Sequence, residues 1–403
     1  MLAQEVDSNL IKKAFAIHGQ ATIVNQYKSA FNAPYSGENS LLTSTENATS
    51  YTSTLYLGLR LNKNTFFYAT PELAGGTGLS KVLGLGDAPN GETFRVTSAD
   101  PKIYIARAYL KKLFTISESD HSYLSLILGK VSLADFYDNN KYSHDPRTQF
   151  LNWGLMSNGA WDYPANTKGY TPSFIVEYYK KNQEFRIGYA LMPTTPNGSI
   201  MDWKMDKSGG FAAEFVQNYE IAKNPGAVRL LGFYNSALMG NYKSALNSNI
   251  ETTRSYKNHK MGWGLNVEQS FGSYLGGFLK TSWNDGTNET WAFTEIDNSV
   301  SLGLSANGTK WGHKLDNFGI AIISSGLATE HQEFLKSGGQ GFTLGDGNLN
   351  YGRENVLECY YQKSIIRQKL MGTIDYQNII NPGFNLDRKG PVNIFSLRLH
   401  YYL

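Results

Sequence analysis

The chain has 403 residues and a net charge of +3 from 37 basic and 34 acidic side chains. This balance argues against nucleic acid or an acidic surface as a partner, and the single cysteine, Cys359, excludes an internal disulfide and a cysteine-based zinc site. Charged residues make up only 18%, whereas aromatics reach 13% and glycines number 40, a composition that favours amphipathic strands joined by turns.

The N-terminal segment, residues 1–15, differs from the rest of the chain. It contains SNLIKKAF, which is compatible with a short helix, and its start, MLAQEVDSN, lacks the basic and apolar parts of a signal peptide. We therefore expect either a cytosolic protein or a mature form whose signal peptide has been removed. No apolar run approaches the roughly 18 residues that indicate a transmembrane helix, but a membrane-spanning strand needs only about 9–11 residues with every second one apolar.

From residue 16 onward, apolar and polar residues alternate with the two-residue period of a β-strand. In STLYLGLRL, Leu55, Leu57 and Leu59 lie on one face, and Thr54 and Arg60 lie on the other. Each such segment predicts a strand with one apolar and one polar face. The sixteen predicted strands are 16–29, 51–61, 65–70, 102–114, 121–131, 172–180, 184–192, 210–221, 227–236, 258–270, 276–284, 290–303, 317–324, 351–363, 368–379 and 392–403.

The segments between these strands tend to alternate in length. Short ones are 62–64, 181–183, 223–226 and 364–368, and long ones are 30–50, 71–101, 132–171, 193–209, 237–257 and 325–350. Two segments break the alternation, because 285–289 is short where a long one is expected and 304–316 is rather long for a tight turn. In a transmembrane up-and-down antiparallel β-barrel, long loops gather at one end and short turns at the other, and an even strand number brings both termini to the end with the turns.

The last predicted strand keeps its pattern to the final residue. Phe395, Leu397 and Leu399 lie on one face, and Arg398 and His400 lie on the other. We expect this strand to pair with the first one, because an open edge would leave backbone groups unpaired in lipid. The final strand of a soluble β-sandwich would show the same local pattern, but sixteen such strands with alternating connections favour the all-β membrane barrel.

The chain also contains three long motifs. They read GKVSLADFYDNNKYSHDPRTQFLNWGLMSNGAWDYPANTKGYT at 129–171, SWNDGTNETWAFTEIDNSVSLGL at 282–304, and GGQGFTLGDGNLNYGRENVLECYY at 338–361, continued by DYQNIINPGFNLDRKGPV at 375–392. Together with weaker matches at 18–26, 31–40 and 229–242, they resemble the carbohydrate-selective porin family of Gram-negative outer membranes, the OprB-like proteins. The C-terminal Leu403 departs from the Phe that is more common in that family.

The resemblance implies an outer-membrane barrel of sixteen strands through which mono- and oligosaccharides diffuse passively, with no reaction and no cofactor. The implied partners are neutral sugars, outer-membrane lipid and the barrel-assembly machinery during insertion, and the protein is expected as a monomer or a homotrimer. On this interpretation, residues 1–15 form a periplasmic segment and residues 16–403 form the transmembrane barrel.

The third long connection, 132–171, is the candidate constriction loop, because porins that resemble this chain tend to fold such a loop into the lumen. Its aromatic rings can meet the apolar C–H faces of a sugar, and its polar groups can exchange hydrogen bonds with the hydroxyls. The candidate contact residues are Asp135, Asp138, His144, Asp145, Arg147, Asn152, Trp153, Trp161 and Asp162. An anchoring role is equally open for each: Asp145 and Arg147 are near enough for an ion pair, and Trp161 is compatible with packing.

The polar positions of the predicted strands are expected to line the channel. They are Arg60, Arg107, Glu177, Arg186, Glu214, Glu268, Lys280, Glu295, Glu358, Asp375 and Arg398. Their mixed signs argue against a strongly ion-selective pore and favour a neutral solute.

Two other functions stay open at this point, a soluble carbohydrate-binding β-protein and an outer-membrane barrel enzyme. An enzyme would need a nucleophile and a base, or two acids, on adjacent strands. The candidate groups set no recognisable catalytic pattern; they include His18, His144, His331, His400, Asp285 and Glu289. The stretch GDGNLNYGRE at 345–354 resembles a calcium loop but lacks its acidic spacing and final Glu, so we predict no metal site.

Overall fold

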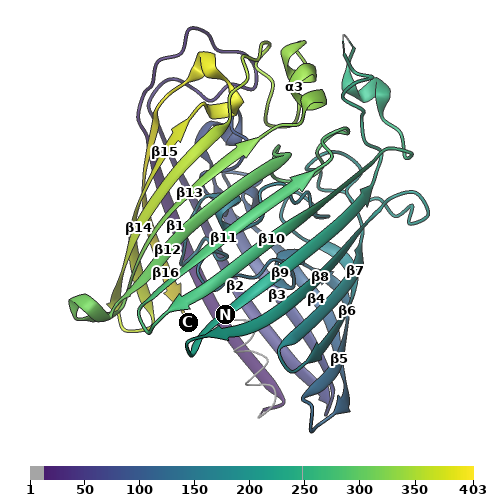
Figure 1. Cartoon of the computed structure of the whole chain (residues 1–403), viewed down its shortest axis with the longest axis vertical. Helices are drawn as coiled ribbons and strands as arrows, with labels where there is room; N and C mark the ends of the chain where they lie inside the picture. The colour runs from purple at the N-terminus through teal and green to yellow at the C-terminus, as the bar shows by residue number, and fades with distance from the viewer. Residues whose placement is uncertain (1–12, 247) are drawn as a thin grey trace.

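The barrel is one closed antiparallel sheet in which each strand pairs with its neighbours in the chain (Figure 1). The computed structural model describes residues 13–246 and 248–403. The strands are β1 (Phe15–Lys28), β2 (Glu46–Asn62), β3 (Thr65–Gly76), β4 (Lys102–Ser117), β5 (Ser122–Val131), β6 (Thr171–Lys180), β7 (Gln183–Ala190), β8 (Gly209–Ile221), β9 (Asn224–Ser236), β10 (His259–Phe271), β11 (Leu275–Asn284), β12 (Asn298–Gly308), β13 (His313–Gly326), β14 (Glu354–Ile366), β15 (Leu370–Ile380) and β16 (Val392–Tyr402).

Short helices occupy the connections between strands. The α-helices are α2 (Trp153–Met156) and α3 (Thr329–Lys336), and the 3-10 helices are η1 (Leu79–Val82), η2 (Thr93–Arg95), η3 (Leu133–Asp135), η4 (Ile250–Thr253), η5 (Thr309–Trp311), η6 (Pro382–Phe384) and η7 (Leu386–Arg388). In the described part of the chain, no helix is long and apolar enough to cross a membrane.

The first and last strands close the barrel. Ile23 pairs with Leu399 and Val24 with Arg398, so the final strand is held along its length, as predicted. Leu399 is 49% exposed on the outer surface, whereas Arg398 is 1% exposed and points inward. Because β1 and β16 pair with each other, neither presents a free edge to lipid.

Each predicted strand overlaps an observed one, and the largest differences are at the third and the twelfth. The sequence predicts the twelfth strand at 290–303, but β12 spans Asn298–Gly308. Residues 290–297 belong to the preceding loop, where Trp291 is buried and its indole N–H donates to the carbonyl of Pro193 at 2.8 Å. The alternating sequence therefore reflects packing inside a loop. With β12 at its true place, the connection before it is long and the turn after it is short, which removes both exceptions to the alternation of lengths.

Strand β3 continues beyond its predicted end at residue 70. A register shift between Thr70 and Pro71 lets the strand pass the proline, which has no N–H to donate. The strand then continues to Gly76 and carries Glu72, which is 1% exposed, on its inner face. The extension brings the Glu72 carboxylate into the barrel interior, although Glu72 is not among the channel-lining residues predicted from the sequence.

Loops and turns lie at opposite ends of the barrel (Figure 1). The turns are 63–64, 118–121, 181–182, 222–223, 272–274, 309–312 and 367–369, and the loops are 29–45, 77–101, 132–170, 191–208, 237–258, 285–297, 327–353 and 381–391. Strand β1 begins and β16 ends at the end with the turns, as predicted. The short helix expected within residues 1–15 falls almost wholly outside the described residues.

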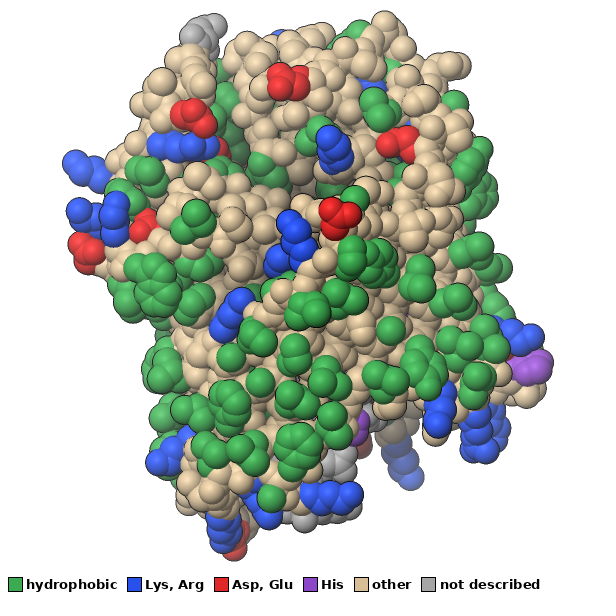
Figure 2. All heavy atoms as spheres, turned by 180° about the vertical axis from the view of Figure 1, so that it is seen from behind, with side chains coloured by type: hydrophobic (Ala, Val, Ile, Leu, Met, Phe, Trp, Pro, Cys, Tyr) green, Lys and Arg blue, Asp and Glu red, His purple; other side chains and the backbone are tan. Residues whose placement is uncertain are grey.

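The outer surface of the wall is apolar. Outward side chains such as Leu230, Leu302 and Ile374 are 54%, 48% and 61% exposed. Figure 2 shows apolar side chains spread over the wall, with many Lys and Arg side chains near its lower rim. Water-soluble proteins rarely expose so large an apolar area, whereas outer-membrane barrels carry such a band against lipid.

Candidate functional site

The inner face of the barrel carries nearly all of the polar positions selected from the sequence. Those on an inner strand face are Arg60, Arg107, Glu177, Arg186, Glu214, Glu268, Lys280, Glu358, Asp375 and Arg398. Glu295 is the exception, because it lies in loop 285–297. There its carboxylate accepts hydrogen bonds from the N–H groups of Thr343 at 2.7 Å and Leu344 at 2.8 Å. The predicted strand position of Glu295 is therefore wrong, and the misplaced twelfth strand explains the error.

The third loop, residues 132–170 between β5 and β6, is bonded through its main chain to side chains on the inner face. The Glu358 carboxylate on β14 accepts hydrogen bonds from the N–H of Leu151 at 2.5 Å and from that of the next residue at 2.9 Å. Arg398 on β16 donates to the carbonyl of Gln149 at 2.8 Å. Charged wall side chains thus replace the water that these backbone groups would otherwise bind.

Lys280 on β11 holds another part of the third loop. Its ammonium group donates to the carbonyls of Ser143 at 2.8 Å, Leu155 at 3.1 Å and Met156 at 3.0 Å. A Lys side chain has three N–H donors, so its hydrogen-bonding capacity is filled by the loop backbone.

Two acidic wall residues bind backbone N–H groups of the same loop. Glu268 on β10 accepts from Lys141 at 2.7 Å, and Glu214 on β8 accepts from Asp138 at 2.7 Å. Glu214 also lies 2.5 Å from a guanidinium nitrogen of Arg186 on β7. Contacts to the third loop therefore come from strands on several sides of the barrel.

One ion pair joins a predicted wall residue to a predicted loop residue. Arg107 on β4 and Asp135 form two parallel bonds, Nε to Oδ2 at 2.5 Å and Nη2 to Oδ1 at 2.6 Å. Burial alone would raise the pKa of Asp135, but the Arg107 guanidinium outweighs it and holds the pKa below its usual range. The carboxylate is therefore ionised at neutral pH.

Arg147 binds two acidic residues that lie outside the predicted set. Its Nη2 is 3.3 Å from Glu72 Oε2, and its Nε is 3.1 Å from Glu92 Oε2. Arg95 joins the same cluster, 3.1 Å from Glu92 and 3.7 Å from Glu72. The Arg147 guanidinium does not bind Asp145, the partner suggested by the sequence; Asp145 accepts hydrogen bonds from the main-chain N–H of Arg147 at 3.0 Å and from the Thr148 hydroxyl at 3.1 Å. The guanidinium thus fixes the loop to β3 and to the loop that follows it.

Burial divides the candidate residues of the third loop into two groups. One group is at most 6% exposed and comprises Asp138, Arg147, Asn152, Trp153, Trp161 and Asp162. The other group, accessible at the surface of the loop, comprises Asp135, His144 and Asp145. A passing solute can touch an accessible side chain without any rearrangement of the loop. Anchoring or packing therefore describes the first group, and the second group stays the candidate for sugar contact.

The two tryptophans of the third loop pack on other aromatic rings. Trp153 stacks on Phe293 with ring centroids 4.6 Å apart, and the ring centroid of Trp161 lies 4.8 Å from that of Tyr163. Phe293 belongs to the loop before β12, so these rings form an aromatic core shared by two loops. Both indoles are buried in it, and neither offers an open face to a solute.

Asn152 begins the short helix α2 and binds an acidic residue from loop 77–101. Its Oδ1 accepts from the N–H of Leu155 at 3.2 Å, which caps the helix, and its Nδ2 donates to Asp87 Oδ1 at 2.8 Å. Burial raises the pKa of Asp87 to about 6, although the bond from Asn152 acts in the opposite direction. Asn152 thus has a structural role.

Asp162 ties the third loop to the loop before β12. Its carboxylate accepts hydrogen bonds from the N–H groups of Trp291 at 2.9 Å and Ala292 at 2.7 Å. Burial raises the pKa of Asp162 to about 6, and the positive charge of Lys260 opposes only part of this effect.

The accessible group combines charged and neutral side chains. Burial, followed by the positive charge of Lys280, lowers the pKa of His144, so its imidazole is neutral at neutral pH. Burial alone would raise the pKa of Asp145, but the neighbouring Arg147 outweighs it and holds the pKa below its usual range. With Asp135, the group offers two carboxylates that accept hydrogen bonds from sugar hydroxyls, whereas the buried Nδ1 of His144 leaves at most Nε2 of that ring for a solute.

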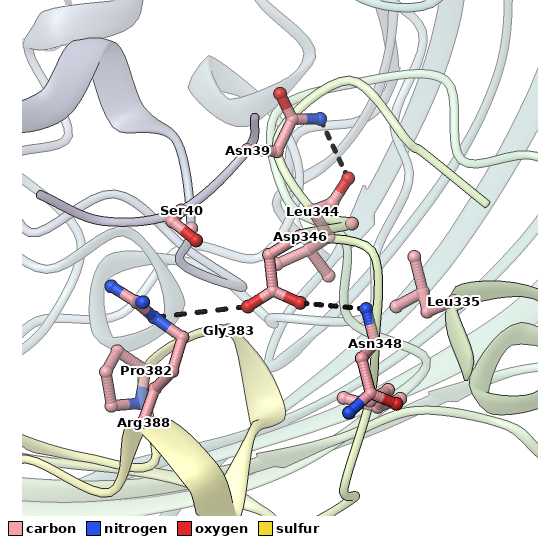
Figure 3. A pocket seen from close by; sticks show the side chains of 12 residues that line it. Asn39, Ser40, Leu335, Leu344, Asp346, Asn348, Pro382, Gly383 and Arg388 are labelled. Atoms are coloured by element: carbon pink, nitrogen blue, oxygen red, sulfur yellow. Dashed lines mark hydrogen bonds and ion pairs between the residues drawn. The ribbon is translucent and has the colours of Figure 1, made fainter. Parts of the chain in front are cut away.

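A junction of three loops, 29–45, 327–353 and 381–391, is drawn from close by in Figure 3, and these loops lie at the end of the barrel opposite the turns (Figure 1). Arg388 Nε is 3.9 Å from Asp346 Oδ2, the N–H of Asn348 donates to Asp346 Oδ1 at 3.5 Å, and Asn39 donates to the carbonyl of Leu344 at 2.8 Å. The pocket among them has a volume of about 10 Å³, room for about one water molecule. Asp346 belongs to the stretch that resembles a calcium loop, and its carboxylate joins the loops together.

The sequence matches a family profile over most of its length. The profile described as "Carbohydrate-selective porin, OprB family" matches residues 38–402. None of the curated proteins compared with the chain matches it.

Solved outer-membrane structures share the fold. The high pH structure of Pseudomonas putida OprB matches with a TM-score of 0.76 at 16% identity, over 98% of this chain and 96% of that chain. The low pH structure of Pseudomonas putida OprB gives 0.55 at 12% identity, over 100% and 96%. Salmonella typhi OmpF in complex with daunomycin gives 0.54 at 11% identity, over 96% and 97%. At these identities the likeness shows the fold alone.

Proposed function

The chain belongs to the carbohydrate-selective porin, OprB family, and from this premise we propose that it is an outer-membrane channel for the passive diffusion of mono- and oligosaccharides. Family membership and the barrel fold indicate a channel rather than an enzyme. The match over residues 38–402 carries the proposal. The mixed signs of the inner face support a neutral solute, because no single charge dominates the path. Insertion by the barrel-assembly machinery and a monomeric or homotrimeric state stay predictions.

We propose further that the third loop lies within the channel and narrows it. Support comes from its main-chain bonds to Glu358, Lys280 and Arg398, which stand on the inner faces of three different strands. The ion pairs of Arg107 and Arg147 add contacts from β4 and β3. A loop held at so many points of the inner wall leaves less of the cross-section open to solutes.

Sugar contact in this constriction is proposed for Asp135, His144 and Asp145, the accessible candidates of the third loop. Their carboxylates and neutral imidazole can exchange hydrogen bonds with hydroxyls and release them again, as conduction requires. Phe136 and Tyr142 are partly accessible neighbours, and their rings are available for the apolar faces of a sugar. They take the role that the sequence suggests for the buried tryptophans.

The test is solute uptake by vesicles that contain the purified, folded protein. We expect neutral mono- and disaccharides to enter at rates that fall with size, without ATP and without a change when ion gradients are collapsed. Sugar acids and amino acids of matched size should enter more slowly. Sugar uptake no faster than in protein-free vesicles would contradict a channel, and rates that depend on size alone would contradict carbohydrate selectivity.

A further inference from the structure

The end of loop 191–208, between β7 and β8, lies against the outside of the barrel. Tyr189 points outward from β7, and its hydroxyl donates to the carbonyl of Ser208 at 2.9 Å. Ser236 points outward from β9 and donates to the carbonyl of Lys207 at 3.1 Å. Figure 1 shows the chain between β7 and β8 reaching outward past the wall at the right of the view.

This segment carries large apolar side chains on its surface. Ile200 and Trp203 are each 69% exposed, and Met205 is 60% exposed. They continue the outward apolar face of the strands beneath them, where Phe211 on β8 is 50% exposed. We call residues 200–207 the outer strap.

The outer strap is bonded to its neighbours, so its backbone is held in place beside the wall. The N–H of Asp202 donates to the carbonyl of Met192 at 2.8 Å, and the Asp202 carboxylate accepts from the hydroxyl of Tyr256 at 2.9 Å. Lys204 donates to the same hydroxyl at 3.2 Å, and its ammonium group lies 5.2 Å from the centre of the ring. Tyr256 belongs to loop 237–258, so two loops hold the strap.

Basic side chains flank the apolar ones. Lys204 and Lys207 lie within the outer strap and Lys257 beside it, all three exposed. Among residues 200–207, Asp206 is the exposed acid, because Asp202 is 5% exposed and bonded. Apolar side chains next to ammonium groups match the boundary of a membrane, where acyl chains end and phosphate groups begin.

We propose that the outer strap is a docking site for phosphate-bearing lipid of the outer leaflet. Ile200, Trp203 and Met205 contact the acyl chains near their head-group ends, and Lys204 and Lys207 bind the phosphates. Continuity with the lipid-facing wall identifies the partner, because the strap lies on the outside of the same strands. The proposal requires a membrane barrel but does not depend on which solute the channel conducts.

The first test measures what surrounds position 203. The variant Trp203→Cys in a Cys359→Ser background is labelled with a fluorophore and inserted into phosphatidylcholine vesicles that contain about one third phosphatidylglycerol. Glu251→Cys, whose parent side chain is 64% exposed on loop 237–258, is the matched control at the same end of the barrel. We expect nitroxides on the acyl chains to quench label 203 several-fold more than aqueous iodide does, with the opposite order for label 251. Quenching of label 203 by iodide alone would overturn the proposal.

The second test concerns the phosphate groups. Lys204→Glu combined with Lys207→Glu should reduce the phosphatidylglycerol retained by the detergent-solubilised protein at least twofold in native mass spectrometry. Lys310→Glu combined with Lys314→Glu, exposed lysines at the end with the turns, should leave retention by the strap unchanged. Equal loss in both variants would contradict head-group binding by the strap. Energy transfer between labels 203 that rises with protein density, together with protection from both quenchers, would show a second copy on the strap and overturn lipid docking. Circular dichroism confirms folding of every variant.

Discussion

Arg107 and Asp135 form a two-pronged ion pair between strand β4 and the third loop, with N–O distances of 2.5 and 2.6 Å. The pair neutralises a wall charge with a loop charge while the carboxylate stays accessible. Asp135 is therefore both an anchor and a candidate sugar ligand, and the two roles can be separated by a substitution that keeps its shape.

Replacing Asp135 with Asn retains a side-chain oxygen that accepts a bond from Arg107 but removes the negative charge. We expect the block of single-channel current by neutral sugars to weaken several-fold at near-constant conductance, because an amide oxygen is a weaker acceptor than a carboxylate. His144→Ala should act in the same direction. The buried Asp138 provides the matched control. Because a solute cannot reach it, Asp138→Asn should leave sugar block unchanged, and any effect should be on conductance and current noise. Sugar block that is unchanged in both Asp135→Asn and His144→Ala would contradict sugar contact by the accessible group.

Replacing Arg147 with Ala leaves the carboxylates of Glu72 and Glu92 with one guanidinium, that of Arg95, in place of two. Breaking a buried ion pair in this way costs about 3–5 kcal/mol, enough to release the loop locally. We expect conductance to rise and become noisier in planar-bilayer recordings with the barrel still folded. Arg147→Met combined with Glu72→Gln should restore a quiet channel, because Arg95 then stays paired with Glu92 and no charge of the cluster is left unpaired. Constant, quiet conductance with weaker sugar block in Arg147→Ala would instead identify a sugar ligand.

Deleting residues 136–160 should widen the channel. We expect single-channel conductance to rise several-fold and sugar block to disappear. The barrel should survive the deletion, because Lys280, Glu268 and Glu358 would then face water and regain hydrogen bonds from it. Heat-dependent mobility on gels and circular dichroism check that the barrel is intact. A folded deletion variant with unchanged conductance and sugar block would place the loop outside the channel.

Asp162 should make stability depend on pH. Its pKa in the folded protein is about 6, above the ordinary 3.8, so its protonated form is favoured by folding. Its contribution to the free energy of unfolding is fully present below about pH 4 and is lost as pH rises through 6. The change in this free energy is on the order of 3 kcal/mol. Asp162→Asn should therefore reduce the fall in the thermal unfolding midpoint between pH 4 and 7 in detergent, and the part that remains comes from groups such as Asp87, whose pKa is also about 6.

The Asp145 carboxyl serves as the control for this pH series. Its pKa lies below the ordinary 3.8, so its contribution to the free energy of unfolding is present above that pH and is lost only as the solution becomes more acidic. Asp145→Asn should therefore keep the wild-type slope between pH 4 and 7. The same slope in wild type and Asp162→Asn would contradict the pKa assigned to Asp162.

Strands were predictable because the outer face meets lipid and the inner face meets polar groups, which imposes a strict period of two. The two-residue period was misleading where loop packing imitates it, as at Trp291, and in β3 it was overlooked beyond Pro71, because a proline usually marks the end of a strand. Glu72 continues the inward series of Tyr68 and Thr70, but only if the strand passes Pro71.

Roles within the third loop were less predictable than the strands. Trp153 has the kind of aromatic ring on which sugars stack, yet this ring is covered by Phe293 from a loop that is distant in the sequence. Arg147 has an acid two positions away, yet its guanidinium binds Glu72 and Glu92 instead. Sequence spacing reports neighbours along the chain, whereas these partners are set by how the loops meet in space.

The bonds from Glu358, Lys280 and Arg398 end on backbone N–H and carbonyl groups of the third loop. Every amino acid supplies the carbonyl, and every one except proline supplies the N–H. Mutations at exposed loop positions such as His144 or Lys141 therefore leave the attachment points intact. Evolution can exchange the recognising side chains while the course of the loop is inherited unchanged. A small number of wall residues would then support a diversity of substrate preferences on one architecture, and a library of loop variants on a constant wall is the corresponding route for engineering.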